Sequence, residues 1–494
     1  MLASAQSSLS IVMVASEAVP FAKTGGLADV TSALAKALGR LGHTVTLVIP
    51  KYRGTAATGG AGSRATVAMA ERRFDLGFVE HSIGPGAAVV LVECDELYDR
   101  DGLYASEGRD HPDNAIRFAM LARAALEYSS RLDRRPDVFH AHDWQAGLVP
   151  AYARTHYART LGTVPTMFTI HNIAYQGVFP ESVLEQLDLD RSLFTVDGLE
   201  FWDQVSFLKA GINLGDLVTT VSEAYARELL TPEMGFGFDG VLRARRDRLR
   251  GILNGVDTEV WDPMRDPYLP ETFSADDLEG KRRLKRHLLE HFGLPTDPAV
   301  LSRPVVGVIS RLVYQKGFDL VADAMEELLD LDASYVVLGT GDAQYEEMWR
   351  AAAVTHPTTI GAHIGYSEFL AHLIEAGSDI FLMPSRYEPC GLNQMYSMRY
   401  GTVPVVRATG GLDDAVVQYD DASARGSGFK FREFTSEAMV AALRRAVNVY
   451  RDARRWRAIQ VEGMTRDFSW TASADAYVRE YRALIASQSD AAGD

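Results

Sequence analysis

Lysine and glycine stand together early in this sequence, between an apolar run and an amphipathic run. The stretch KTGGLADV places Lys23 just before Gly25 and Gly26. Bare backbone N–H groups at the start of a helix attract an anion, and a lysine adds a point charge, so the pattern favours a phosphate. The spacing matches neither G-x-G-x-x-G nor a Walker loop. A plain tight turn accounts for the two glycines equally well.

A second group of cations occurs in the stretch SRLVYQKG, where Arg311 and Lys316 flank a short loop between an apolar run and a helical pattern. One cation is a rigid planar fork and the other is a flexible point charge, a combination that suits a diphosphate. Solvated surface charge is the alternative, since most arginines and lysines are exposed. The repetition of the phosphate pattern in both halves of the chain favours the diphosphate.

Glu388 follows the apolar run DIFLMPS, in a Glu-Pro-Cys-Gly turn that leads into a helical pattern. Its carboxylate would lie near the start of that helix, where negative charge is favoured. It could accept hydrogen bonds from sugar or ribose hydroxyls, and a helix-capping role is the alternative. For Cys390, a packing role is preferred to a reactive thiol, because a free cysteine usually behaves as a small hydrophobe.

Polar residues end two further apolar runs, in the stretches HAHDW and IHN. They are His140, His142, Asp143, His171 and Asn172. In open parallel sheets ligands bind at the carboxyl ends of the strands, so these side chains are candidates for a site. His140 and His142 would share one face of a strand, which leaves a metal site as a weak alternative. No cysteine or surrounding pattern supports a metal, and none is expected.

The elements that position these residues form repeated strand, loop, helix, strand units. Residues 9–17 are a continuous apolar run typical of a buried strand, 27–41 have helical spacing, and 44–50 predict the next strand. Such units favour a parallel sheet. The pattern restarts at residues 304–310. The sequence therefore predicts an α/β chain of two Rossmann-like domains with parallel sheets that face each other across a deep cleft.

The expected domain boundaries follow from this restart. Residues 1–251 are predicted to form the first domain, which the C-terminal helix 468–494 joins, and residues 252–467 the second. The charged stretch 276–294 predicts a surface helix. The Gly/Ala/Ser-rich stretch 54–65 predicts a surface loop.

Bulk composition excludes several classes of protein. The chain has 494 residues, a formal net charge of −16 and two cysteines. An acidic surface disfavours DNA or RNA as a main partner, and two distant cysteines give no disulfide framework. No apolar stretch is long enough to span a bilayer, and the first ten residues lack the features of a secretory signal. The expected location is a reducing compartment, the cytoplasm.

Taken together, the motifs resemble those of bacterial glycogen synthases, which are close relatives of plant starch synthases. KTGGLADV, HAHDW, HNIAYQG, NGVD, SRLVYQKG, EPCGLNQ and YGTVPVVRATGGL occur in this order over nearly the whole chain. The resemblance implies a GT-B fold and transfer of glucose from ADP-glucose to the non-reducing end of an α-1,4-glucan, glycogen or a maltooligosaccharide, with retention at the anomeric carbon. No cofactor, metal, nucleic acid or membrane is expected, and the oligomeric state is not predicted.

The resemblance also implies roles for individual residues. Arg311 and Lys316 match the diphosphate-binding pair, Glu388 the active-site glutamate, and His171 and Asp143 the polar lining of the sugar pocket. These five are the expected catalytic residues. The expected substrate-binding residues, with Tyr366 near the adenine, are Lys23, Gly25, Gly26, Asn254, Tyr366, Cys390, Gly391 and Leu392.

The sequence departs from the family pattern at two positions, Gln145 in place of the more frequent histidine and Asn393 in place of threonine. Both change polar detail near the acceptor or the donor. Many relatives with this fold carry a second glutamate at the position of Tyr396, so their ribose recognition cannot be transferred to this chain.

Other functions compete with this interpretation. A UDP-glucose-dependent enzyme of the same architecture is the nearest alternative, and the sequence discriminates weakly against it. A nicotinamide dehydrogenase lacks support because G-x-G-x-x-G is absent. A non-catalytic glucan-binding protein would not need a diphosphate site, and a phosphorylase-like enzyme would carry pyridoxal phosphate.

Overall fold

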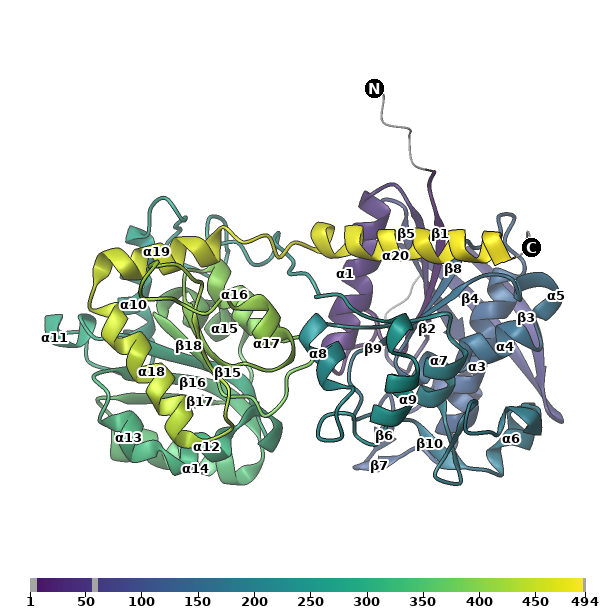
Figure 1. Ribbon diagram of the computed structural model, residues 1–494, viewed down its shortest axis with the longest axis horizontal. Helices are drawn as coiled ribbons and strands as arrows, with labels where there is room; N and C mark the ends of the chain where they lie inside the picture. The colour runs from purple at the N-terminus through teal and green to yellow at the C-terminus, as the bar shows by residue number, and fades with distance from the viewer. Residues whose placement is uncertain (1–6, 56–60, 492–494) are drawn as a thin grey trace. The chain divides into compact units, whose positions relative to one another are not determined.

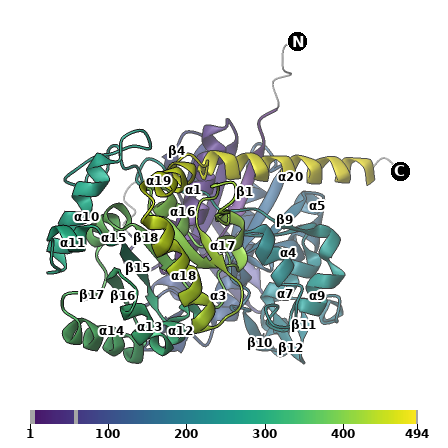
Figure 2. The same ribbon diagram turned by 60° about the vertical axis from the view of Figure 1, so that its left-hand side comes forward.

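The computed structural model describes residues 7–55 and 61–491 and divides the chain into two compact units. Unit 1 comprises Met1–Val221, Ala226–Gly255 and Trp470–Asp494, and unit 2 comprises Ser222–Tyr225 and Val256–Ser469. Each unit contains one large sheet covered by helices (Figures 1 and 2).

The sheet of unit 1 has nine strands in the order β14-β13-β9-β8-β1-β2-β5-β4-β3. The strands are β1 (Ser10–Val14), β2 (Thr44–Pro50), β3 (Ala61–Met69), β4 (Arg72–Gly84), β5 (Ala87–Glu93), β8 (Val138–His142), β9 (Thr166–Ile170), β13 (Leu217–Thr220) and β14 (Leu249–Gly251). The seven strands from β14 to β5 are parallel, as the strand, loop, helix, strand pattern predicts. All five residues of β1 are buried, because helices cover both faces of a parallel sheet.

An antiparallel hairpin, β3 and β4, extends this sheet at the β5 edge. It overturns part of a prediction, since residues 61–65 belong to β3 and not to a surface loop. Residues 56–60 lie outside the described part of the chain. Backbone pairing with β4 over the full length of β3 outweighs the low strand preference of the Gly/Ala/Ser-rich residues at its start.

The helices of unit 1 and its short strands complete the fold. The helices are α1 (Gly26–Arg40), α2 (Asp95–Tyr98), α3 (Asn114–Ser129), α4 (Val149–Arg154), α5 (Ala158–Leu161), α6 (Val183–Gln186), α7 (Phe207–Leu214), α9 (Asp239–Ala244) and α20 (Trp470–Ala491), and α8 (Glu223–Glu228) joins both units. The short strands are β6 (Ala105–Ser106), β7 (Arg109–Asp110), β10 (Val178–Pro180), β11 (Glu200–Phe201) and β12 (Gln204–Ser206).

The sheet of unit 2 has six parallel strands in the order β17-β16-β15-β18-β19-β20. The strands are β15 (Val305–Leu312), β16 (Ser334–Gly341), β17 (Ile360–Ile364), β18 (Ile380–Met383), β19 (Val403–Arg407) and β20 (Phe429–Phe431). The helices are α10 (Glu279–His291), α11 (Pro298–Leu301), α12 (Phe318–Asp323), α13 (Met325–Leu329), α14 (Ala343–Thr355), α15 (Glu368–Gly377), α16 (Asn393–Arg399), α17 (Gly410–Ala415), α18 (Ser436–Tyr450) and α19 (Ala453–Met464).

Both sheets reverse their strand order at one point. In chain order, the parallel strands of unit 2 are arranged 3-2-1-4-5-6, and β5-β2-β1-β8-β9-β13 of unit 1 have the same arrangement. The reversal lies between β15 and β18 in unit 2 and between β1 and β8 in unit 1. In such sheets the loops that follow these two strands diverge and leave a crevice for a ligand. The fold therefore predicts that the segments after β1, β8, β15 and β18 contact a ligand.

The C-terminal helix α20 belongs to unit 1, where it packs on α1 (Figure 1). Tyr481 of α20 is fully buried, and its hydroxyl lies 2.7 Å from Nδ1 of His140 in β8. Ser473 donates a hydrogen bond to the carbonyl oxygen of Leu253. None of the helices in the described part of the chain combines the length and apolar character needed to cross a membrane.

We expect Tyr481→Phe to lower the free energy of unfolding by about 1–2 kcal/mol, because it leaves Nδ1 of the buried His140 without its partner. Denaturant unfolding followed by circular dichroism measures this change. Tyr175→Phe is the matched control, since Tyr175 is 60% exposed and its hydroxyl remains accessible to water in the native state. Equal stability of the two variants would contradict a structural role for this contact.

Candidate active site

A pocket of about 180 Å³ lies where the strand order of unit 2 reverses. Its walls come from the ends of β15 and β18 and from the loops that follow them. The lining includes five of the residues named from the sequence: Arg311, Lys316, Glu388, Gly391 and Leu392. The structure therefore brings the two predicted cations and the predicted carboxylate of this half into one pocket.

Lys316 and Glu388 form an ion pair in this pocket, with Nζ 2.5 Å from Oε2. Their side chains are 17% and 8% exposed, and the hydroxyl of Ser385 donates to the same carboxylate oxygen at 3.1 Å. The pair thus holds the ammonium group at a fixed place on the pocket wall. A partly buried charge pair with a further hydrogen bond is more rigid than two solvated side chains.

Gly317, directly after Lys316, allows the close approach of the two loops. Its φ is +76°, and a Cβ at this position would lie 2.0 Å from the carbonyl oxygen of Pro384. A side chain here would be strained and would collide with backbone, so the residue must be glycine. The motif SRLVYQKG ends with this glycine, but its contact with Pro384 joins residues far apart in the chain and has no local signal in the sequence.

Backbone contacts fix the turn that carries Glu388. The amide of Gly411 donates to the carbonyl oxygen of Glu388 at 3.0 Å, and a Cβ at Gly411 would lie 1.9 Å from the carbonyl oxygen of Cys390. Gln394 donates to the carbonyl oxygens of Cys390 and Gly391. The start of α17 and the start of α16 therefore hold the turn from both sides.

The alternative roles of Glu388 and Cys390 can be judged from this geometry. Helix α16 has Leu392 as its N-cap, with no side-chain cap hydrogen bond among the described residues, while the Glu388 carboxylate contacts Lys316 and Ser385. These contacts favour a site role over capping. Cys390 is buried next to the pocket, which agrees with the packing role.

Arg311 and Tyr366 are the more exposed members of the predicted site in unit 2. Arg311 lies near the end of β15, and its Nη2 donates to Oε1 of Gln315 at 3.1 Å. Asn393, one of the two departures from the family pattern, lines the same pocket and donates to the carbonyl oxygen of Ile309 at 2.8 Å. Tyr366 is 81% exposed, contacts Glu368 through its hydroxyl and is not among the residues that line the pocket.

In unit 1, the loop with Gly25 and Gly26 follows β1 and leads into α1. Lys23 is half-exposed and forms an ion pair with Asp29 of α1, with Nζ 2.8 Å from Oδ1. A Cβ at Gly25 or Gly26 would meet nothing within 4 Å. The two glycines therefore leave open space beside the backbone at the start of the helix, as close approach of a ligand requires.

The carboxylate of Glu17, which is 3% exposed, organises this loop. It accepts hydrogen bonds from the amide and hydroxyl of Thr24, at 2.5 and 2.7 Å, and from the amide of Gly25 at 3.3 Å. The hydroxyl of Tyr104 donates to it as well. The sequence predicts that this loop binds an anion. In the structure, the Glu17 carboxylate already accepts hydrogen bonds from Thr24 and Gly25 of the loop.

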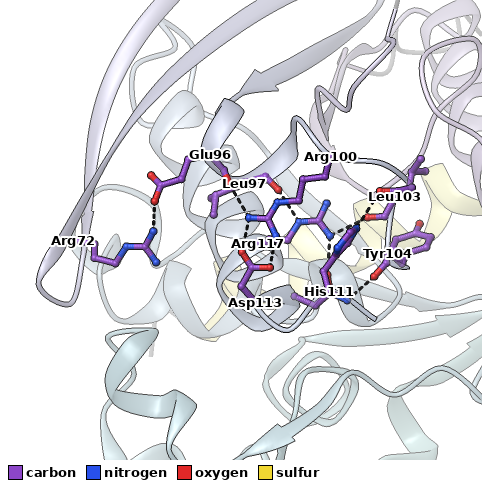
Figure 3. Close-up of polar contacts among 11 residues, drawn as sticks. Arg72, Glu96, Leu97, Arg100, Leu103, Tyr104, His111, Asp113 and Arg117 are labelled. Carbon is purple, nitrogen blue, oxygen red and sulfur yellow. Dashed lines mark hydrogen bonds and ion pairs between the residues drawn. The ribbon is translucent and has the colours of Figure 1, made fainter. Parts of the chain in front are cut away.

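The segment that leads to Tyr104 is held by a buried arginine, Arg117, whose contacts with this segment are drawn in Figure 3. Arg117 of α3 is fully buried and donates to the carbonyl oxygens of Leu97 and Leu103, at 2.7 and 3.0 Å. Arg100, which belongs to the segment 97–104, forms a bidentate pair with Asp113, the N-cap residue of α3, at 2.5 and 2.6 Å. The segment from 97 to 104 is therefore fixed on α3 and presents the Tyr104 hydroxyl to Glu17.

The polar residues after β8 and β9 form a second cluster in unit 1. Oδ1 of Asp143 accepts from the amide of His171 at 2.7 Å, and Nε2 of His171 lies 3.0 Å from Nδ1 of His142. Both ring nitrogens of His140 are within hydrogen-bond distance of hydroxyls, those of Tyr481 and Thr169. These contacts give His140 a structural role and leave Asp143 and His171 as the functional candidates.

Burial shifts both candidates away from their charged forms. It raises the pKa of Asp143 to about 7, although hydrogen bonds from the backbone amides of His171 and Asn172 oppose the shift. It lowers the pKa of His171 to about 3, so this imidazole is neutral at pH 7. A neutral imidazole and a half-ionised carboxyl can each donate or accept a hydrogen bond from a hydroxyl.

Two buried amide side chains in unit 1 have incomplete hydrogen bonding. Asn254 is 5% exposed and Gln145 is 7% exposed, and within the described residues neither side-chain oxygen has a hydrogen-bond partner. A buried acceptor without a partner is costly, which is one reason to expect that a ligand completes it. Asn254 was predicted as a substrate-binding residue, and Gln145 was noted only as a departure.

Four residues that position the site are not among those predicted from the sequence: Glu17, Tyr104, Ser385 and Gly411. Glu17 and Ser385 end the first apolar run and the DIFLMPS run, so a systematic reading of strand ends would have included them. Tyr104 and Gly411 act through contacts with Glu17 and with the Glu388 turn. No local pattern signals contacts of that kind.

Comparison with known proteins places both units in described families. The family model of the starch synthase catalytic domain matches residues 10–244, and that of glycosyl transferases group 1 matches residues 297–460. Glycogen synthase from Anaeromyxobacter dehalogenans (strain 2CP-1 / ATCC BAA-258) is 50% identical over 96% of this chain and 99% of its own length. Glycogen synthase from Myxococcus xanthus (strain DK1622) is 46% identical over 97% of this chain and 100% of its own.

Solved structures agree with these relatives. The catalytic domain of starch synthase IV from Arabidopsis thaliana, bound to ADP and acarbose, is 34% identical with a TM-score of 0.86, over 97% of this chain and 100% of that one. Sucrose-phosphate synthase from Thermosynechococcus elongatus, at 18% identity and a TM-score of 0.60 over 97% and 100%, shares the fold.

We expect Asp143→Asn to change how stability depends on pH. The pKa of the native carboxyl, about 7, is above the ordinary value of 3.8, so the native state holds this proton more tightly than the unfolded state. The contribution of Asp143 is complete below pH ~4 and is lost as the pH rises to ~7, by roughly 1.4 kcal/mol per pH unit. The stability difference between variant and parent should therefore shift in favour of Asn across this range.

Urea unfolding at several pH values measures that difference. Asp247→Asn is the control, because the side chain of Asp247 is 92% exposed. A parallel pH dependence for the parent and Asp143→Asn would refute the buried, proton-holding carboxyl.

The ion pair between Lys316 and Glu388 predicts non-additive stability effects. Lys316→Met and Glu388→Gln should each lower the free energy of unfolding by about 2 kcal/mol, because each leaves the other group largely buried without its charged partner. The double variant should lose clearly less than the sum. A double-mutant cycle in denaturant tests the coupling, and strict additivity would exclude it.

Proposed function

Because the chain belongs to the glycogen synthase family and is a glycosyltransferase with the GT-B fold, we propose that it elongates an α-1,4-glucan from ADP-glucose, with retention at the anomeric carbon. Glucose would be added at the non-reducing end of glycogen or a maltooligosaccharide. The observation that carries the proposal is the meeting of Arg311, Lys316 and Glu388 in one pocket at the strand reversal of unit 2.

In this proposal, Arg311 and Lys316 neutralise the diphosphate of the donor. Negative charge grows on the leaving ADP as the bond to glucose breaks, and fixed cations stabilise that charge more than they stabilise the ground state. The ion pair with Glu388 holds Lys316 in place before the donor arrives, so little reorganisation is needed. The two cations supply the charge that a metal ion provides in other transferases.

The groups of unit 1 would act on the same donor and on the sugar. Lys23 and the open backbone at Gly25 and Gly26 are suited to a phosphate, since the glycines leave space at the helix start. Asp143 and His171 would hold glucose hydroxyls in their uncharged or half-charged forms. The first domain would then carry the acceptor and the second the nucleotide sugar.

The remaining expected substrate-binding positions keep the roles that the resemblance implies. Tyr366, which is 81% exposed, would lie near the adenine. The side-chain oxygen of Asn254 would accept a hydrogen bond from a hydroxyl group of the donor substrate. Gly391 and Leu392 would contact the donor from the pocket wall, with Cys390 packed behind them.

The pocket favours a front-face route to retention. Retention by double displacement needs a carboxylate nucleophile, and the carboxylate among the lining residues, Glu388, is engaged by Lys316. In the front-face route, the bond from C1 to the phosphate oxygen breaks with its electron pair on that oxygen. The acceptor hydroxyl oxygen bonds to C1 on the same face, and its proton passes to the departing phosphate.

The decisive experiment incubates the full chain with ADP-glucose and a maltooligosaccharide and follows chain length by chromatography. Elongation with an α-linkage, established by NMR, supports the proposal. UDP-glucose in a parallel reaction tests the nearest alternative donor. Elongation with UDP-glucose alone would overturn the ADP-glucose assignment, and the absence of elongation with both would overturn the proposed reaction.

We expect Arg311→Ala and Lys316→Ala to lower kcat by roughly two to three orders of magnitude, the loss that follows removal of a donor aimed at transition-state charge. Arg350→Ala is the matched control: Arg350 is half-exposed, belongs to unit 2 and pairs with Glu346 away from the pocket lining. Initial rates at saturating donor measure the effect, and near-normal kcat in both variants would refute the leaving-group role.

Glu388→Gln should remain folded and lose transfer, because the amide keeps the shape of the turn but no longer pairs with Lys316. Thermal unfolding and turnover are measured on the same sample. Early melting with turnover intact would assign Glu388 a purely structural role.

A further inference from the structure

Unit 2 has a second pocket, of about 570 Å³, that the proposed function does not use. It lies between α10, the end of α11 and the junction of α18 with α19. Helices α10 and α19 both lie in the upper part of unit 2 in Figures 1 and 2. One wall of this pocket is formed by the charged run KRRLKR, residues 281–286. The sequence predicts a surface helix for this run.

Cations dominate the lining of this pocket. Seven lysines and arginines face two carboxylates, in a chain whose formal net charge is −16. The cations are Lys281, Arg282, Arg283, Lys285 and Arg286 from α10, and Arg451 and Arg457 from the opposite wall. Positive charge on two facing walls of a concave surface concentrates the field and attracts an anion.

The floor of the pocket is already neutralised and rigid. Nζ of Lys285 lies 2.7 Å from Oδ2 of Asp379 and 2.9 Å from the hydroxyl of Tyr450. Lys281, which is 4% exposed, donates to the carbonyl oxygen of Ala376 and the hydroxyl of Thr402. The buried lysines are therefore satisfied, and the arginines above them are more exposed, with Arg282 and Arg283 paired to Glu279 and Glu271.

Those arginines retain hydrogen-bond donors for a ligand. Arg282 uses one nitrogen on Glu279 of its own helix, at 2.8 Å, and Arg457 uses one on the carbonyl oxygen of Asp276, at 2.7 Å. Arg451 is 64% exposed and its charge partner, Asp332, is 3.7 Å away. A guanidinium has five N–H donors, so each of these groups keeps several that can chelate phosphate oxygens.

Trp456 gives the pocket a rigid aromatic wall. Its side chain lines the pocket, is 4% exposed and packs edge-on against Tyr450, with ring centroids 5.2 Å apart. Seven cations and a fixed aromatic side chain thus line the same cavity.

We propose that this pocket, framed by α10 and the α18–α19 junction, binds a small phosphate ester. The concave shape and the half-hidden cations fit a compact anion better than a nucleic acid, which needs an extended basic surface. The pocket is distinct from the donor site, because Asp379 at its floor immediately precedes β18, whereas the donor pocket lies at the other end of this strand.

Isothermal titration of the full chain with inorganic phosphate, a hexose monophosphate and a hexose bisphosphate tests the site, with saturating ADP to fill the donor pocket. At least one phosphate ester should bind, and Arg282→Ala combined with Arg457→Ala should weaken it about tenfold or more. Arg425→Ala is the matched control, because Arg425 is 79% exposed, lies in unit 2 and is absent from the pocket lining.

Three results would overturn the proposal: unchanged affinity in the double variant, complete displacement by ADP, or no binding of any of the three compounds up to about 10 mM. A single-stranded RNA oligonucleotide that binds more tightly than every ester, in a manner that depends on the same two arginines, would reassign the surface to nucleic acid. The readout is binding and not transfer, so Glu388→Gln should bind the ester like the parent. Failure here is therefore separate from failure of the proposed reaction.

Discussion

The arrangement of the candidate active site depends on the reversal of strand order in each sheet. After β15 and after β18 the chain leaves the sheet toward opposite sides, which opens a crevice at the carboxyl ends of these strands. The loops that follow these strands must then cover a crevice lined with backbone and polar side chains. Arg311, Lys316 and Glu388 stand in those loops, and their meeting in one pocket follows from topology before any side-chain contact is considered.

Close backbone packing fixes the positions of the Lys316 loop and the Glu388 turn beside this crevice. Gly317 brings the Lys316 loop against Pro384, and Gly411 brings the start of α17 against the Glu388 turn. Neither approach tolerates a Cβ, so the position of both charged groups is set by main-chain contacts and not by flexible side chains. The ion pair that results costs desolvation, and it holds the lysine at a fixed place on the pocket wall, as the proposed diphosphate site requires.

The sequence was sufficient for features that local patterns encode. Strand ends and loop composition identified Arg311, Lys316, Glu388, Asp143 and His171, because a parallel strand and its polar tail are adjacent in the chain. The hairpin of β3 and β4 was missed because pairing, not residue preference, makes residues 61–65 a strand. The contact of Tyr104 with Glu17 was also beyond reach, since it depends on how Arg117 holds a distant segment.

Polar groups that are poorly satisfied in the free protein mark the same regions that topology selects. Asn254 has a buried oxygen without a partner in the described residues, and Asp143 is buried deeply enough to hold its proton near neutral pH. Each feature costs stability, and a fold selected for stability alone would remove it. A hydroxyl-rich ligand would provide donors and acceptors for both groups, which is the role that the proposed function gives them.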